Sequence, residues 1–116
     1  MGEDLDLRRA LLTARDEARD RVVEFDAVTR ELAASRTDSD ADDEHDPEGS
    51  TVSWERAVAA ASLDAARDHL RDVEAALARV EAGWDGACAG CGRSIPVARL
   101  AVRPQTDRCV SCAAKT

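Results

Sequence analysis

Apolar residues recur at helical spacing along two long segments of the chain. Between residues 4 and 36 neither glycine nor proline interrupts the sequence, and apolar side chains return every seven positions, at Leu11, Ala18, Phe25 and Leu32. In the second segment, residues 51–82, the steps alternate between three and four, as in Leu63, Ala66, Leu70, Val73, Leu77 and Val80. This is the a/d pattern of a coiled coil. We therefore predict two long amphipathic helices, over about residues 4–36 and 51–82.

The two apolar stripes need partners, because neither is stable against water by itself. The segment between them, residues 37–50, is rich in aspartate and glutamate and contains Pro47, before which a helix does not easily run. Gly83 supplies a stop for the second helix. We predict a mainly α protein: an antiparallel two-helix coiled-coil hairpin over residues 1–83 with an acidic tip, followed by a small cysteine module over residues 84–116.

Composition explains why a hairpin suits this chain better than a globular core. Only 3% of its 116 residues are aromatic, and many of its apolar residues are alanine. A chain with so little to bury usually needs a helical seam or a staple. No apolar run is close to the length of about 20 residues that a membrane-spanning helix needs. The acidic N-terminus lacks the apolar segment of a secretory signal. We expect a cytoplasmic protein without membrane contact, and such proteins rarely contain disulfides.

All cysteines of the chain fall in two Cys-x-x-Cys pairs near the C-terminus, Cys88 with Cys91 and Cys109 with Cys112. Each pair presents two thiolates to one ion, and two pairs complete the tetrahedron that Zn²⁺ prefers. A redox dithiol or a pair of disulfides is the alternative, but redox motifs usually come as one pair beside a βαβ pattern. The spacing therefore predicts one structural zinc ion, closed to water and unable to catalyse.

Charge is divided unevenly between the two parts. The whole chain has a net charge of −8, and residues 84–116 have five basic and two acidic residues, or +3, which leaves −11 for residues 1–83. A chain this acidic is poorly suited to neutralise nucleic-acid phosphates, so we expect no direct DNA binding. No nucleophile–base pair and no glycine-rich phosphate loop stands out in the sequence, which predicts a protein that is not an enzyme.

The acidic segment admits three interpretations. It is a solvated loop, a calcium loop, or a functional tip that presents carboxylates to a metal or basic group of a partner. Asp38, Asp40 and Asp42 have the first three spacings of a calcium loop. Asp43 and Gly49 then stand where that loop needs its glycine and its closing glutamate, which argues against calcium. The first and third interpretations stay open on composition alone.

The C-terminal segment resembles the Cys₄ zinc finger of the DksA/TraR family. The matching positions comprise an aromatic–x–Gly lead, Cys-x-x-Cys-Gly, an isoleucine, an Arg-Leu pair, an Ala-x-x-Pro stretch and the second cysteine pair. In this chain they are Trp84, Gly86, Cys88, Cys91, Gly92, Ile95, Arg99, Leu100, Ala101, Pro104, Cys109 and Cys112. The hairpin with an acidic tip in front of the finger agrees with the family in layout.

The resemblance implies a bacterial transcription regulator that binds RNA polymerase and inserts its hairpin into the secondary channel to modulate initiation. The family's tip pattern is Asp-x-x-Asp-x-Ala, and Asp43 and Asp46 match its two aspartates, with Glu48 in place of the alanine. Some members also form a guanosine tetraphosphate site with the polymerase. Arg103 matches one basic residue of that site, but Ala113 stands where a lysine is expected, so dependence on this nucleotide stays open.

Two further expectations complete the sequence-based prediction. Arg99 and Arg103 are candidates for contact with an anion or a partner, and we expect the protein to be a monomer. The alternative function is a zinc-stapled interaction adaptor that has the same fold and a partner other than RNA polymerase.

Overall fold

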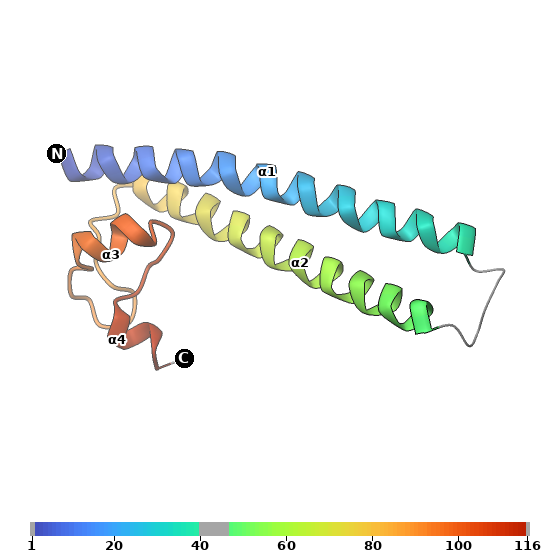
Figure 1. Ribbon diagram of the computed structural model, residues 1–116. Coiled ribbons are helices and arrows are strands. Elements are labelled where there is room, and N and C mark those ends of the chain that lie inside the picture. Colours follow the sequence, from blue (N-terminus) through green and yellow to red (C-terminus); the bar gives the residue numbers. More distant parts are fainter. Residues whose placement is uncertain (1, 40–46, 116) are drawn as a thin grey trace. The chain divides into compact units, whose positions relative to one another are not determined.

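The fold is mainly helical. The computed structural model describes residues 2–39 and 47–115. It contains four helices in these ranges: α1 Gly2–Ser39, α2 Pro47–Glu81, α3 Val97–Val102 and α4 Val110–Ala113 (Figure 1). Within the same ranges β structure amounts to one antiparallel bridge, between Ala87 and Ser94. The predicted fold class, a two-helix hairpin followed by a small C-terminal cysteine module, is confirmed.

Both long helices extend further toward the tip than the sequence indicated. Helix α1 has 38 residues and reaches Ser39, and α2 has 35 residues and begins at Pro47 rather than near residue 51. Proline is well suited to the first position of a helix, because its fixed φ is helical and its missing N–H has no partner there. The division of the chain into a hairpin over 1–83 and a finger over 84–116 stays a prediction.

Helix α2 ends just before Gly83, as the sequence predicted. Gly83 has a φ of +96°, a conformation that favours glycine. The N–H of Gly83 donates to the carbonyl oxygen of Val80 at 3.1 Å, and the N–H of Trp84 donates to that of Arg79 at 2.9 Å. These two bonds form a Schellman motif, which satisfies the last carbonyls of the helix and turns the chain into the cysteine module.

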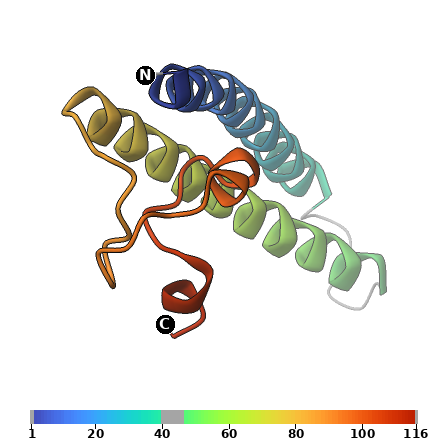
Figure 2. The ribbon, with the colours of Figure 1, turned by 90° about the vertical axis from the view of Figure 1, so that its left-hand side faces the viewer.

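The structure divides into two compact units, one formed by Met1–Glu17 with His69–Thr116 and the other by Ala18–Asp68. Each unit contains a segment of α1 beside a segment of α2, as Figures 1 and 2 both show. The predicted apolar stripes therefore pack on each other within each unit.

In the first unit, the apolar seam is centred on Leu11 and Val73, both fully buried. They pack with Ala76 and Leu77, and half-buried neighbours complete the cluster: Leu7, Leu12, Ala14 and Val80. Arg8 of α1 lies 3.9 Å from Glu81 of α2 at the exposed edge of the seam. The heptad positions predicted in this part of both helices are thus the ones that face inward, although Leu70 is only half-buried.

In the second unit, the seam is lined mainly by small side chains. Its buried residues are Ala18, Ala59, Leu63 and Ala66. Phe25 and Leu32, both predicted for the seam, are half-buried. Val28 of the same helix is 40% exposed. Asp26 lies 3.1 Å from Arg30 of its own helix and 3.8 Å from Arg67 of α2, so an ion pair flanks the seam.

None of the helices within the described ranges combines the length and the apolar character that crossing a bilayer requires.

We predict that Leu11→Ala lowers the free energy of unfolding by about 2–5 kcal/mol, because it opens a cavity at a fully buried position. Val23 of the same helix is 70% exposed. Val23→Ala should therefore change the free energy by no more than about 0.5 kcal/mol. Urea unfolding followed by circular dichroism measures both. Equal effects of the two substitutions would show that the heptad stripe does not form the core.

Candidate metal centre

The first cysteine pair lies in a tight turn after the end of α2. The N–H of Cys88 donates to the carbonyl oxygen of Arg93 at 2.7 Å, and the N–H of Gly92 donates to that of Cys88 at 2.9 Å. Gly92 has a φ of +76°, which a residue with a side chain rarely adopts. These contacts close a short loop that turns Cys88 and Cys91 toward the same point.

The second pair lies at the start of a helix. Cys109 has an extended backbone and directly precedes α4, and Cys112 lies within that helix. The N–H of Ala89 donates to the carbonyl oxygen of Asp107 at 2.8 Å, which connects the first turn to the segment before the second pair. Two segments separated by seventeen residues in the sequence are thereby brought together.

The four sulfurs lie within 4.8 Å of one another. The Sγ atoms of Cys91 and Cys109 are 3.9 Å apart, and all four cysteines are free thiols. In a tetrahedral site with Zn–S bonds of about 2.3 Å, neighbouring sulfurs are about 3.8 Å apart. The cluster thus has the ligand type, the number of ligands and the spacing of a closed zinc site.

Gly90 lines the sulfur cluster and leaves room for it. A Cβ atom added at this glycine would lie 2.9 Å from the Sγ of Cys112 and 3.7 Å from the Sγ of Cys88. Any side chain at position 90 would therefore displace a sulfur from the cluster. The absence of a Cβ here lets Cys112 lie close to the turn that contains the first cysteine pair.

Backbone N–H groups favour the thiolate form of Cys88, the buried member of the cluster. The N–H groups of Cys109 and Gly90 each donate to its Sγ at 3.3 Å. These donors lower the pKa of the Cys88 thiol to about 6, and the hydrogen bond from Cys109 contributes most. Burial acts in the opposite direction but is outweighed. A thiolate is the form that binds zinc, so the backbone favours metal binding at this position.

The pKa values of Cys109 and Cys112 are shifted in opposite directions. Hydrogen bonds with Cys109 and Cys88, together with burial, raise the pKa of the Cys112 thiol to about 12. The backbone N–H of Cys112, more than any other group, lowers the pKa of Cys109. Zinc binding to this cluster must therefore release protons, and the affinity should fall with falling pH as protons compete for the thiolates.

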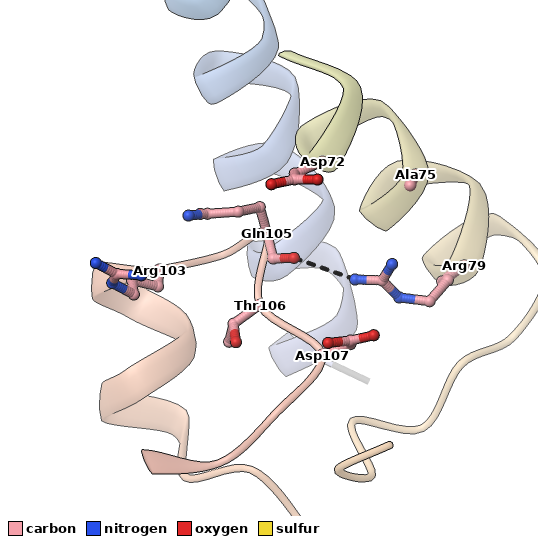
Figure 3. A pocket seen from close by; sticks show the side chains of 7 residues that line it. All are labelled: Asp72, Ala75, Arg79, Arg103, Gln105, Thr106 and Asp107. Carbon is pink, nitrogen blue, oxygen red and sulfur yellow. Dashed lines mark hydrogen bonds between the residues drawn. The ribbon is translucent and has the colours of Figure 1, made fainter. Parts of the chain in front are cut away.

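Trp84 and Arg79 connect the end of α2 to the finger. The indole Nε1 of Trp84 donates to the carbonyl oxygen of Ala87 at 3.1 Å, and the guanidinium carbon of Arg79 lies 5.4 Å from the ring centroid. Arg79 also donates to the carbonyl oxygen of Gln105 at 3.2 Å, the bond that Figure 3 marks. A cation on an aromatic face and a charged hydrogen bond are both favourable.

Beside Arg79 lies a cavity of about 250 Å³. It is lined by residues of α2 and of the loop before Cys109, which Figure 3 shows: Asp72, Ala75, Arg79, Arg103, Gln105, Thr106 and Asp107. The lining contains two arginines and two aspartates, so their formal charges cancel.

The predicted site residues do not all lie in one place in the structure. It brings the four cysteines together and puts Arg103 in the wall of the cavity. Arg99 is half-buried, and its guanidinium donates inward to the carbonyl oxygen of Arg108 at 2.7 Å. Asp43 and Asp46 lie outside the described residues.

Three residues contribute to the site without having been predicted for it. Gly90 is visible in the sequence as the small residue inside the first cysteine pair, but only the closeness of Cys112 explains why it must be small. Arg79 and Thr106 belong to no recognisable motif, and only the folded chain brings them to the finger.

Comparisons with known proteins agree with this site and this fold. The family described as prokaryotic dksA/traR C4-type zinc finger matches residues 78–116. An uncharacterised protein of Aquifex aeolicus (strain VF5) is 43% identical over 44 residues, which are 38% of this chain and 30% of that relative. The matched segment thus spans under a third of the relative's length.

Among solved structures, that of transcription factor DksA2 from Pseudomonas aeruginosa is similar over 99% of this chain and 83% of its own, with a TM-score of 0.78 and 21% identity. At this identity the likeness shows that the fold is shared. The zinc-finger match and the clustered cysteines together indicate one structural zinc ion.

We predict one equivalent of zinc per chain in purified protein, because four clustered thiolates form a closed site. Cys109→Ser removes one of the four sulfurs and should lower the zinc content measured by elemental analysis. Ser94→Ala, in the same module but outside the cluster, is the control and should leave it unchanged. Fully folded protein with two disulfides and no zinc would contradict the prediction.

Gly90→Ala should weaken zinc binding by about 1–3 kcal/mol, the usual cost of forcing a methyl group into a filled space. Competition with a chromophoric chelator measures the affinity. The neighbouring Ala89 is exposed, so Ala89→Ser should bind zinc as the parent does. If Gly90→Ala retains full affinity, the cluster is looser than the structure indicates.

Proposed function

We propose that this chain, whose residues 78–116 match the zinc finger of the DksA/TraR family, is a bacterial transcription regulator that binds RNA polymerase directly. The observation that supports the proposal most strongly is that the family's finger and a helical hairpin like that of a transcription factor occur together in one chain. In this proposal the protein regulates another enzyme and performs no chemistry itself.

The zinc ion has a structural role in this proposal. We assign Cys88, Cys91, Cys109 and Cys112 as its ligands, which leaves no open position for water or substrate. Their closeness in space and the room that Gly90 leaves support this assignment. The ion then stabilises the finger, which follows the end of α2.

The hairpin is the element that we propose to enter the secondary channel of the polymerase. Residues 1–83 of the chain have a net charge of −11, and seven acidic residues lie between positions 38 and 48. Carboxylates this close repel one another and add little to folding. Their concentration around the connection from α1 to α2 in the sequence supports a role in contact with a metal ion or basic groups of the partner.

Direct binding to DNA is not part of the proposal. The protein has a net charge of −8, whereas duplex binding depends on neutralising phosphates. Of the arginines in the finger, Arg99 is directed inward, and Arg103 lines a cavity that also contains two aspartates. Binding to promoter DNA that weakens steeply with salt would contradict this part of the proposal.

The proposal is tested first by affinity capture of RNA polymerase from a bacterial lysate on immobilised protein. The core subunits should be retained by the parent chain. Capture of a different protein without the polymerase would support the adaptor function instead. Transcription from several promoters by purified polymerase, with and without the protein, then measures the regulatory effect.

We predict that Asp43→Asn with Asp46→Asn greatly reduces the effect on transcription and leaves helicity and zinc content unchanged. The reason is that these two aspartates match the family's tip spacing, while the apolar seam and the sulfur cluster lie elsewhere in the chain. Circular dichroism, zinc analysis and in vitro transcription measure the three properties, and binding to the polymerase should largely survive.

The matched control changes Asp38 and Asp40 to asparagine, which removes the same charge from the same acidic segment. This variant should regulate transcription nearly as well as the parent. If the Asp43/Asp46 variant is also fully active, the acidic segment is a solvated loop and the tip has no specific role.

A further inference from the structure

One peptide group of the finger is held at both of its ends. It joins Arg108 to Cys109. Its carbonyl oxygen accepts hydrogen bonds from Arg99 Nε at 2.7 Å and from Thr106 Oγ1 at 3.0 Å. Its N–H, on Cys109, donates to the Sγ of Cys88 at 3.3 Å. The peptide therefore connects a guanidinium group on one side with a buried cysteine sulfur on the other.

Thr106 fixes the geometry of this arrangement from a third direction. Its hydroxyl donates to the Arg108 carbonyl oxygen, and it accepts from the Arg108 N–H at 3.2 Å and from Arg99 Nη2 at 3.4 Å. A hydroxyl has one donor and two acceptor sites. All three are used here, so its position is determined by both Arg99 and the peptide.

Arg99 is itself held firmly. It lies in α3, where its N–H donates to the Pro96 carbonyl oxygen at 3.0 Å and its own carbonyl accepts from the Arg103 N–H at 2.8 Å. Its side chain is half-buried. The guanidinium is thus anchored to a helix that lies between the two cysteine pairs in the sequence.

The charge of Arg99 acts in the right direction to help the sulfur cluster. A peptide has its negative end at the carbonyl and its positive end at the N–H. A cation at the carbonyl polarises the group further, and hydrogen bonds in such a chain strengthen one another. The N–H of Cys109 then becomes a better donor to the negative sulfur of Cys88.

We propose that Arg99 is a positioning residue of the metal centre, which acts through the Arg108–Cys109 peptide by aiming its N–H at the Cys88 sulfur. Partners of this kind around a metal typically contribute about 10- to 100-fold to its affinity. This role differs from contact with an external anion or partner, because two donor atoms of the guanidinium are turned into the finger.

The test measures zinc affinity by competition with a chromophoric chelator. Arg99→Gln should bind zinc about 10- to 100-fold more weakly, and Arg99→Lys, which keeps the charge, should recover part of the loss. The control Arg93→Gln removes the same charge from an exposed side chain near the cluster and should leave the affinity unchanged. Equal loss in both glutamine variants would overturn the proposal in favour of a general charge effect.

A second measurement separates positioning from a general loss of stability. Amide hydrogen exchange of zinc-saturated protein, followed by NMR, reports on single N–H groups. In Arg99→Gln the Cys109 amide should exchange at least tenfold faster, whereas the Gly92 amide, bonded to the Cys88 carbonyl oxygen at 2.9 Å, should keep its rate. Acceleration of both amides together, or of neither, would overturn the proposal.

Thr106 provides a variant with the same logic and a smaller change. Thr106→Ser retains the hydroxyl and should keep parental zinc affinity, whereas Thr106→Val removes it at nearly constant volume and should weaken binding. These variants decide the matter if Arg99→Gln does not fold. Equal affinity of the serine and valine variants would contradict the role assigned to the peptide. Each of these outcomes is independent of any effect on transcription.

Discussion

The closeness of four cysteine sulfurs is the constraint on which the C-terminal part of this protein depends. Within the described residues after α2, only Cys88 and Ile95 are buried, and neither α3 nor α4 has a buried residue. A segment with so little apolar burial has little hydrophobic free energy to offset its conformational entropy. Metal binding supplies that free energy in small domains of this kind. The turns around the cysteines bring their four sulfurs close enough to bind one ion.

The helical hairpin uses a different source of stability. Of the ten buried residues described in the chain, four are alanine. Small side chains allow two helices to lie close together, but each of them buries little apolar area. The total buried area therefore depends on the length of the seam. The large residues Leu11 and Val73, which are fully buried, lie in the unit that also contains the finger. The best-packed part of the seam thus belongs to the same compact unit as the sulfur cluster.

Two arginines, one at the end of α2 and one in the finger, make structural contacts around the cysteine module. Arg79 stacks on Trp84 and donates to the Gln105 carbonyl oxygen, and Arg99 donates to that of Arg108. These contacts replace the apolar core that the module lacks, because a charged hydrogen bond is stronger than a neutral one. The positive charge of the finger is in part structural, which agrees with a protein whose proposed partner is another protein.

The sequence by itself determined the helical periods, the stop at Gly83 and the grouping of the cysteines, because each depends on local spacing and backbone preference. It misplaced the start of α2, since Pro47 is both a barrier to a preceding helix and a good first residue of the next. Only the tertiary structure decided that Gly90 must lack a side chain and that Arg99 is turned toward the Arg108–Cys109 peptide. Gly90 lies against the side chain of Cys112, and Arg99 donates to a carbonyl oxygen nine residues further along the chain. Both contacts join residues that come together only in the folded chain.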